Sequence, residues 1–282
     1  MLRLLIHALA VMAGLEGPVP PVELSRVTVI PAPVAVPVVT EDLEPADFMD
    51  DDVVLDRSRV LKLNGDVLYP FDPDVSEVDL VIFWPGLGYG TQRMVLEHER
   101  YGVAPALAAS GLDPHGSSQV LVLVVKEPRR AWTRVARTIK RLESEHGVRV
   151  RSKTLGCWSG GASGASTALN ADEEFRGWFM ADPSPSVARR SSWPKDEPSA
   201  TVPTIRVWRN PNNWGRQAGP GGYYRRDIPA FLDAIDRLGG HSISNTHHHK
   251  ELLFMGLTAA IKTARSASAL AVYDGIADVT EE

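Results

Sequence analysis

Ser159 lies in a run of small residues that suits a nucleophile. The sequence Cys157-Trp-Ser159-Gly-Gly161 places a small residue two positions before the serine and another two positions after it. A serine on a sharp turn between a strand and a helix needs both, because larger side chains would collide across the turn. The following helix would point its N-terminus at the hydroxyl and favour developing negative charge. Ser159 is therefore the candidate nucleophile. The alternative is a small-residue loop that only connects two elements. Ser163 fits a similar pattern but ranks lower, because it would lie in the first helical turns.

The candidate acid is Asp182, which follows a predicted strand at 176–181. A carboxylate that accepts a hydrogen bond from an imidazole fixes its tautomer and stabilises the imidazolium. The alternative role for Asp182 is an Asp-Pro turn that caps backbone N–H groups. Asp227 is a distant third choice for the acid.

Three adjacent histidines follow a weak edge strand predicted at 241–245. A neutral imidazole could take the proton of the serine hydroxyl. His247 comes directly after the strand and is the first choice for this base, His248 is the second, and His249 is expected to begin a helix. Adjacent histidines point in different directions, so no metal site is predicted here.

A glycine-rich turn at 85–90 follows the apolar run 78–84. Backbone N–H groups of Leu87 and Gly160 are the predicted oxyanion hole, which would bind the negative charge of a tetrahedral intermediate. The alternative is an ordinary turn between a strand and a helix. The turn is a poor phosphate loop, because no Lys-Ser/Thr pair follows and its glycines lack the dinucleotide-binding spacing. No cofactor is predicted.

The elements that must position these residues alternate along the chain. Apolar runs and the Asn64-Gly65 turn predict strands, and helical periodicity predicts helices between them. The predicted strands are 59–63, 66–69, 78–84, 119–125, 153–158, 176–181, 204–208 and 241–245, and the predicted helices are 94–110, 132–146, 223–238 and 251–265. This alternation predicts an α/β fold, a three-layer sandwich with a mostly parallel sheet and helices on both faces.

Three segments are predicted along the 282 residues: an N-terminal segment with a Pro-rich arm at 1–48, an α/β domain at 49–268 and a C-terminal tail at 269–282. The acidic run Asp50–Asp52 is expected to be a solvated turn. The first 14 residues resemble a weak secretion signal, so secretion is the alternative to the favoured soluble, cytoplasmic location.

Composition narrows the class of partner. The chain is 44% hydrophobic with a net charge of −5, and its basic residues form no stripe, so no nucleic-acid binding is expected. No apolar run reaches the roughly 18 residues that span a bilayer, so no integral membrane segment is expected. Cys157 is the single cysteine, and it is interpreted as a small packed hydrophobe. The oligomeric state is left open.

Four motifs in the order serine, acid, histidine resemble the α/β-hydrolase superfamily. They are Trp84-Pro-Gly-Leu-Gly88, Cys157-Trp-Ser-Gly-Gly161, Ala181-Asp-Pro183 and Thr246-His-His-His249. The resemblance covers residues 53–265 at the level of element order, and the chain looks somewhat like the cutinase and phage lysin-B branch. It implies a serine esterase or lipase that cleaves a small-molecule or lipid-like carboxylic ester through an acyl-serine intermediate, without a cofactor.

One departure from that superfamily concerns the acid. Many members carry it after the strand predicted here at 204–208, where this chain has Asn210, Asn212 and Asn213. Two alternatives therefore stay open. One is a catalytically inactive hydrolase fold that acts as a binding or assembly protein, with the Pro-rich arm docking on a partner. The other is a peptidase or amidase of the same fold.

Overall fold

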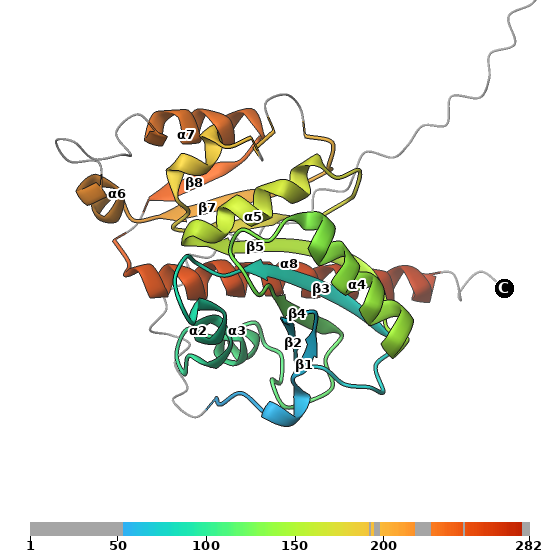
Figure 1. Ribbon diagram of the computed structural model, residues 1–282. Coiled ribbons are helices and arrows are strands. Elements are labelled where there is room, and N and C mark those ends of the chain that lie inside the picture. Colours follow the sequence, from blue (N-terminus) through green and yellow to red (C-terminus); the bar gives the residue numbers. More distant parts are fainter. Residues whose placement is uncertain (1–52, 192, 195–197, 218–226, 245, 278–282) are drawn as a thin grey trace, which may run out of the picture. The chain divides into compact units, whose positions relative to one another are not determined.

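The computed structural model describes residues 53–191, 193–194, 198–217, 227–244 and 246–277, with the backbone alone at 215–217 and 267–277. All of these residues belong to the compact unit Val38–Glu282. The predicted N-terminal segment 1–48 and the acidic run at 50–52 lie outside the described residues. The described chain forms one mixed sheet with helices on both of its faces, seen in Figure 1.

The sheet has eight strands in the order β1-β2-β4-β3-β5-β6-β7-β8. β2 pairs antiparallel with β1 and β4, and the other neighbours pair in parallel. The strands are β1 (Leu61–Leu63), β2 (Asp66–Tyr69), β3 (Glu77–Trp84), β4 (Val120–Val124), β5 (Arg149–Trp158), β6 (Trp178–Ala181), β7 (Ile205–Arg209) and β8 (His241–Ser244). The mostly parallel sheet predicted from the sequence is confirmed.

Helices connect the strands and cover the sheet. They are α2 (Thr91–Glu97), α3 (Val103–Ala109), α4 (Trp132–His146), α5 (Ala162–Ala165), α6 (Pro211–Gln217), α7 (Asp227–Arg237) and α8 (His249–Ala277), with single 3₁₀ turns at Arg57–Arg59, Ser159–Gly161, Ser166–Asn170 and Pro185–Arg189. α4 has the predicted bounds, and Gly147 ends it in the left-handed conformation with φ 68°. No helix in the described part of the chain combines the length and the apolar character needed to cross a bilayer.

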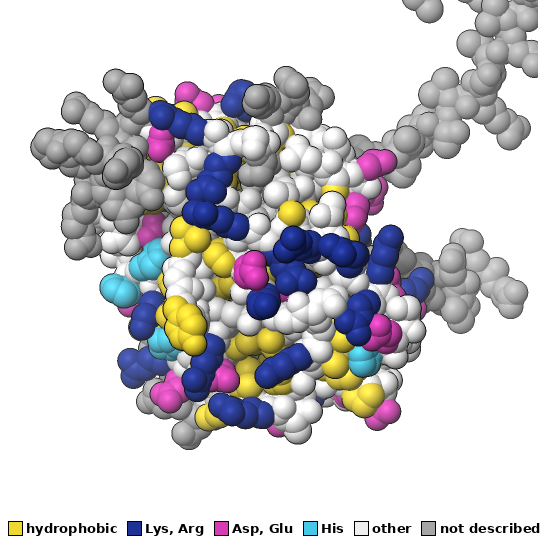
Figure 2. All heavy atoms as spheres, viewed as in Figure 1, with side chains coloured by type: hydrophobic (Ala, Val, Ile, Leu, Met, Phe, Trp, Pro, Cys, Tyr) yellow, Lys and Arg dark blue, Asp and Glu magenta, His cyan; other side chains and the backbone are white. Residues whose placement is uncertain are grey.

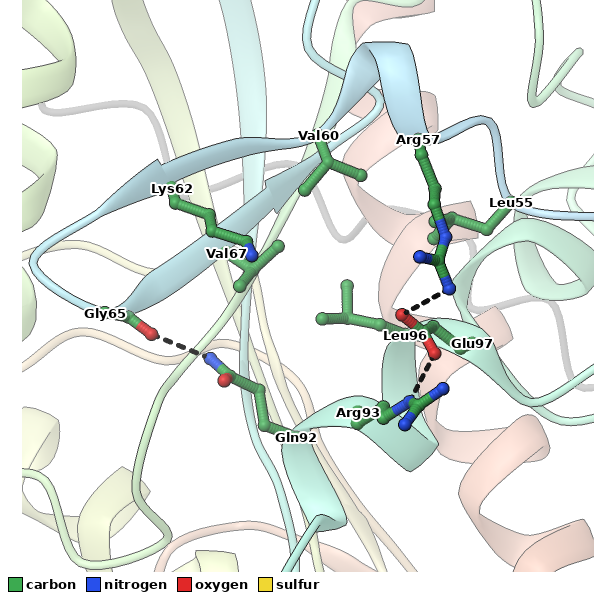
Figure 3. Close-up of a pocket in the computed structure, with 10 residues that line it drawn as sticks. All are labelled: Leu55, Arg57, Val60, Lys62, Gly65, Val67, Gln92, Arg93, Leu96 and Glu97. Atoms are coloured by element: carbon green, nitrogen blue, oxygen red, sulfur yellow. Dashed lines mark hydrogen bonds and ion pairs between the residues drawn. The ribbon is translucent and has the colours of Figure 1, made fainter.

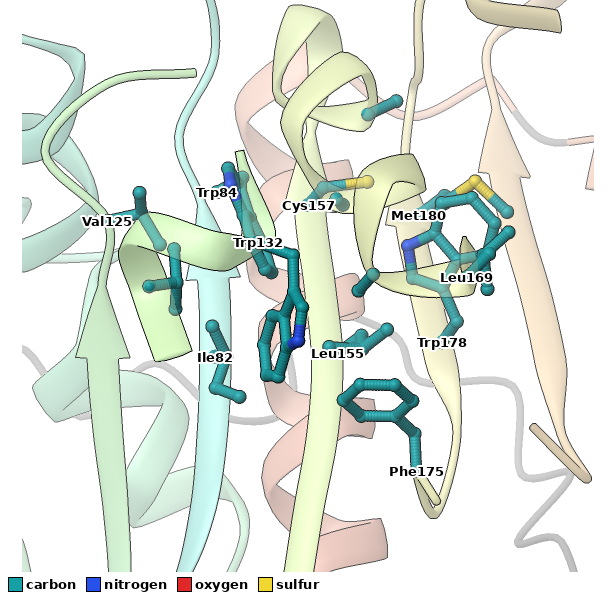
Figure 4. Packing of buried hydrophobic residues seen from close by; sticks show 14 of the residues in the cluster. Ile82, Trp84, Val125, Trp132, Leu155, Cys157, Leu169, Phe175, Trp178 and Met180 are labelled. Carbon is teal, nitrogen blue, oxygen red and sulfur yellow. The ribbon is translucent and has the colours of Figure 1, made fainter. Parts of the chain in front are cut away.

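The core has two halves, one on each face of the sheet. Along β3, Leu80, Ile82 and Trp84 face the half that α4, α5 and α7 cover, whereas Val81 and Phe83 face the half under α2, α3 and α8. This alternation follows from the period of two along a strand. Figure 4 shows the first half, where the side chains of neighbouring strands pack against Trp132 of α4. Full burial of one such large side chain stabilises the fold by about 1.5–3 kcal/mol.

Two predicted helices differ from the observed ones. The single helix predicted at 94–110 is two helices, α2 and α3, separated by residues 98–102. Pro105 explains the break, because a proline is tolerated in the first turn of a helix but clashes with the preceding turn in its interior. A side chain at Gly102 would also press on the carbonyl of His98 at 2.7 Å. The last helix, α8, begins at His249 and continues to Ala277, past the predicted end near 265 and past the predicted start of the tail at 269.

The parallel strands end at one edge of the sheet. Trp84 of β3 pairs with Cys157 of β5, and Trp158 pairs with Ala181 of β6. Ala181 in turn pairs with Trp208 of β7. The carboxyl ends of these strands therefore lie level, and the loops that follow them meet at the edge where open α/β sheets bind ligands.

Candidate active site

Ser159 follows β5 directly and has a strained backbone. Its φ is +52°, in the left-handed region that residues other than glycine seldom adopt. The chain passes from β5 through the 3₁₀ turn Ser159–Gly161 into α5. A side chain at Gly161 would overlap the backbone carbonyl of Trp84, so a small residue is required there. On the other side, Cys157 is fully buried, and burial raises the pKa of its thiol. Cys157 is thus part of the core, whereas Ser159, the predicted nucleophile, is only partly buried.

The glycine-rich turn after β3 lies against the Ser159 turn. A side chain at Gly86 would come within 2.9 Å of the Trp158 ring and 3.3 Å of Cβ of Ser159. A side chain at Gly160 would overlap that of Leu87. Thr91, at the start of α2, holds the turn by donating a hydrogen bond to the Gly86 carbonyl at 2.8 Å. The two predicted oxyanion-hole residues therefore pack on each other beside the serine, and their role in binding an oxyanion stays a prediction.

Asp182 follows β6 and is held by the neighbouring strand. Its φ is +41°, and its backbone N–H donates to the Trp208 carbonyl at 2.7 Å. The carboxylate is buried and accepts two hydrogen bonds from the segment after β7: Oδ1 from the Asn210 backbone N–H at 3.2 Å, and Oδ2 from Nδ2 of Asn213 at 2.9 Å. These donors fix the direction in which the second oxygen, Oδ2, faces.

Oδ2 of Asp182 contacts His249. Its distance to Nδ1 of the imidazole is 2.6 Å, and the His249 side chain is about one third exposed, at 32%. Trp158 supports the same histidine in two ways. The two ring centroids lie 4.6 Å apart with the ring planes tilted by 36°, and the indole N–H donates to the His249 carbonyl at 3.0 Å. Because Trp158 directly precedes Ser159, these contacts link carboxylate, imidazole and the serine turn.

The histidine that contacts Asp182 is not the one favoured from the sequence. The favoured residues, His247 and then His248, contact Glu251 in the first turn of α8: Nδ1 of His247 lies 3.4 Å from its carboxylate, and the backbone N–H of His248 donates to it at 2.6 Å. His249 begins α8, as predicted, and this is the position from which an imidazole reaches Asp182. The partner of Asp182 is therefore corrected to His249. The three histidines differ in direction, and only the position of the acid distinguishes them.

The asparagines after β7 belong to the site. Asn210 and Asn213 stand at the strand end where many members of the resembled superfamily carry the acid, and both donate hydrogen bonds to Asp182. The sequence alone predicted no role for these two asparagines. The run Asn210-Pro-Asn-Asn213 at the end of a predicted strand was the available signal, because amides there can hold a carboxylate from the adjacent strand.

The lower-ranked candidates have other contacts. Ser163 is buried in α5, after the turn, where its carbonyl accepts a hydrogen bond from Ser166. Asp227 begins α7 and forms an ion pair with Arg189 at 2.6 Å. Among the described residues, no group of three His, Cys, Asp or Glu side chains is placed to hold a metal ion.

A cavity of about 450 Å³ lies away from these residues, between the β1–β2 hairpin and α2 (Figure 3). Apolar side chains form its floor, and Glu97 pairs at its rim with Arg57 at 3.5 Å and with Arg93 at 2.5 Å. Its lining residues are Leu55, Arg57, Val60, Lys62, Gly65, Val67, Gln92, Arg93, Leu96 and Glu97. The lining includes none of the candidate catalytic residues, so the site is defined by its hydrogen-bonded side chains and not by this hollow.

Charged side chains on the face drawn in Figure 2 are mixed. Lys and Arg occur in several separate groups, with acidic and hydrophobic side chains between them. The expectation that the protein does not bind nucleic acid stays a prediction.

The strand order, the antiparallel β2 and the placement of a strained serine after β5 define the α/β-hydrolase fold. The fold class expected from the motif resemblance is confirmed.

Comparison with solved structures returns distant hydrolases. A siderophore hydrolase from Aspergillus nidulans is 13% identical, covering 76% of this chain and 97% of its own, with a TM-score of 0.44. An S-formylglutathione hydrolase from Agrobacterium tumefaciens is 12% identical, covering 73% and 93%, with a TM-score of 0.48. An acetyl ester-xyloside bifunctional hydrolase from Caldicellulosiruptor lactoaceticus is 13% identical, covering 71% and 84%, with a TM-score of 0.40. No family model matches the sequence, and no curated protein matches it.

Proposed function

We propose that this protein is a serine hydrolase that cleaves carboxylic esters, with Ser159 as nucleophile, His249 as general base and Asp182 as the acid that orients the base. The observation that carries the proposal is the 2.6 Å contact between Asp182 and Nδ1 of His249, with that imidazole packed against the ring of Trp158, the residue before a strained serine. A buried carboxylate, an imidazole and a serine at a strand-to-helix turn are the parts that serine acyl transfer needs.

The chemistry follows from the nitrogen that Asp182 contacts. A carboxylate accepts hydrogen bonds, so Nδ1 carries the ring proton and Nε2 keeps its lone pair. Nε2 takes the proton of the Ser159 hydroxyl while Oγ bonds to the ester carbonyl carbon. The tetrahedral intermediate then collapses, and the alcohol leaves with the proton from Nε2. Water, deprotonated at the same nitrogen, attacks the acyl-serine, releases the carboxylic acid and restores the serine.

Negative charge forms on the carbonyl oxygen in both steps. The backbone N–H groups of Leu87 and Gly160 are the proposed donors for it, since the two residues pack together beside Ser159. Removing one such donor in comparable enzymes costs about 10²–10³ in kcat. Leu87, which packs on Gly160, is 51% exposed, and Tyr89 in the same turn is fully exposed. Their apolar surface near the serine turn suits the acyl or alcohol group of an ester.

A fluorophosphonate probe and a short p-nitrophenyl ester test the proposal together. The probe should add to Ser159 of the folded protein, as read by peptide mass spectrometry, and Ser159→Ala should abolish both labelling and turnover. Ser163→Ala is the matched control and should keep both. His249→Ala should lose turnover, whereas His247→Ala and His248→Ala should retain it. Full activity of His249→Ala would remove the assigned base. A wild-type protein that neither labels nor hydrolyses the ester would favour the non-catalytic alternative.

A further inference from the structure

Asn210 follows the end of β7 and makes hydrogen bonds in three directions. The residue is 6% exposed. Its backbone N–H donates to Oδ1 of Asp182 at 3.2 Å, and its Nδ2 donates to the His247 carbonyl at 2.7 Å. Its Oδ1 accepts the backbone N–H of Asn212 at 2.8 Å. The buried side chain of Asn210 therefore joins the segment after β7 to the segment that carries His249. The backbone N–H of the same residue bonds Asp182.

The segment before His249 has little core beneath it. All of β8 (His241–Ser244) is exposed, and so are Thr246 and His248. Buried apolar contacts, which position most of the sheet, therefore hold this stretch weakly. The bond from Asn210 reaches the chain two residues before the imidazole. This hydrogen bond therefore fixes the position of the backbone immediately before His249.

The side chain of Asn210 also orders the residue that bonds Asp182 on the other side of the contact between Asp182 and His249. Oδ1 of Asn210 accepts from the backbone N–H of Asn213 at 3.4 Å as well, which closes the turn that begins α6. That turn presents Nδ2 of Asn213 to Oδ2 of Asp182, the oxygen that His249 contacts. The carboxamide of Asn210 thus acts on both partners of the contact. Its oxygen orders the turn that carries Asn213, which bonds Asp182, and its NH₂ group bonds the chain just before His249.

We propose that Asn210 is a positioning residue whose carboxamide keeps His249 on Asp182. The inference rests on the proposed function for its effect on turnover. It assigns a role to an asparagine at the strand end where many members of the resembled superfamily carry the acid. A misplacement of catalytic groups by about 1 Å can cost about 10²-fold in rate, so a link between the two loops has a large kinetic effect.

Asn210→Asp tests the proposal, because it keeps the size of the side chain and the acceptor but loses the donor to the His247 carbonyl. We expect kcat for a short p-nitrophenyl ester to fall about 10²-fold, with KM within about twofold. Asn212→Asp is the matched control. It adds the same charge in the same turn on an exposed side chain, and it should keep kcat within about twofold. Asn210→Ala removes the donor without adding charge and should lose as much kcat as Asn210→Asp.

A substrate-free measurement separates this inference from the proposed function. The Nδ1 proton of a histidine bonded to a carboxylate gives a low-field proton NMR signal, which His249→Ala identifies by its absence. The signal should persist in Asn212→Asp and be lost or shifted in both Asn210 variants.

If wild type hydrolyses no ester but the signal changes in this way, the proposed function fails and the positioning role stands. An unchanged signal with wild-type kcat in Asn210→Asp would overturn the positioning role. Failure of both Asn210 variants to fold would overturn it too, because it would make Asn210 a requirement of the fold.

Discussion

Replacement of Asp182 by asparagine tests the assigned contact most directly, because the neighbours determine how the new amide must sit. Oδ1 of Asp182 faces a backbone N–H, that of Asn210, and Oδ2 faces Nδ2 of Asn213 and Nδ1 of His249. The new NH₂ group must replace one of these oxygens. At the Oδ1 position it would oppose a backbone donor that cannot turn away. At the Oδ2 position it would oppose an amide that can rotate and a ring that can change its tautomer.

The second arrangement is therefore the expected one, and it inactivates the base. With NH₂ against Nδ1, the imidazole must accept there and carry its proton on Nε2, where it cannot take a proton from the serine. In serine hydrolases of known mechanism, this substitution of the triad acid lowers kcat by about 10⁴. At 1.36 kcal/mol for each factor of ten, the loss of transition-state stabilisation is about 5.4 kcal/mol. The loss of a buried charge-assisted hydrogen bond should also reduce the free energy of unfolding by about 1–3 kcal/mol.

The assay is ester turnover at saturating substrate, with thermal unfolding followed by circular dichroism. Asp227→Asn is the matched control, since Asp227 is equally buried at 5% but pairs with Arg189 instead of a histidine. It should lose stability but keep kcat within about threefold of wild type. Near wild-type turnover in Asp182→Asn would refute the reasoning. An equal loss of kcat in the two variants would refute it as well, because the effect would then come from general destabilisation.

Three further predictions concern the turn around the serine. Gly161→Ala should lower the free energy of unfolding by about 1–3 kcal/mol, because the new methyl group would overlap the Trp84 carbonyl; an unchanged melting temperature would contradict this. Trp158→Phe keeps a ring against His249 but loses the N–H donor to its carbonyl, so we expect a loss of about 1 kcal/mol in stability together with a lower kcat, measured by chemical denaturation and steady-state kinetics. Burial raises the pKa of the Cys157 thiol, so at pH 8 it stays protonated and covered. Iodoacetamide should then modify it only in denaturant, and rapid alkylation of the folded protein, seen by mass spectrometry, would show that the thiol is accessible.

Much of the fold could be predicted from local patterns. The continuous apolar runs at β3 and β4 indicated strands buried on both faces, and Asn64-Gly65 indicated the β1–β2 hairpin. α4 was predicted with its observed bounds because its apolar face and its terminal glycine are both local signals. The break between α2 and α3 was missed even though its cause, Pro105, is also local. Apolar periodicity alone predicts one continuous helix there, whereas the backbone requirement of the proline divides it.

For the candidate site, the sequence could predict some residues but not others. Small residues around Ser159 and an acid at the end of the next strand are local features, so both could be proposed from the sequence. The choice of histidine could not. Adjacent residues at the start of a helix differ in direction, and Asp182, which distinguishes them, lies 67 positions away from His249 in the chain.

The sequence by itself therefore determined most of the strands and helices, their order, and which kinds of reactive side chain follow the strand ends. The tertiary structure alone decided which imidazole faces Asp182, and that asparagines from the adjacent strand end support the carboxylate. The physical reason is the range of the interactions. Backbone conformation follows from residues a few positions apart, whereas a hydrogen bond between loops depends on the register of whole strands and on side-chain directions that become defined only when the sheet is assembled.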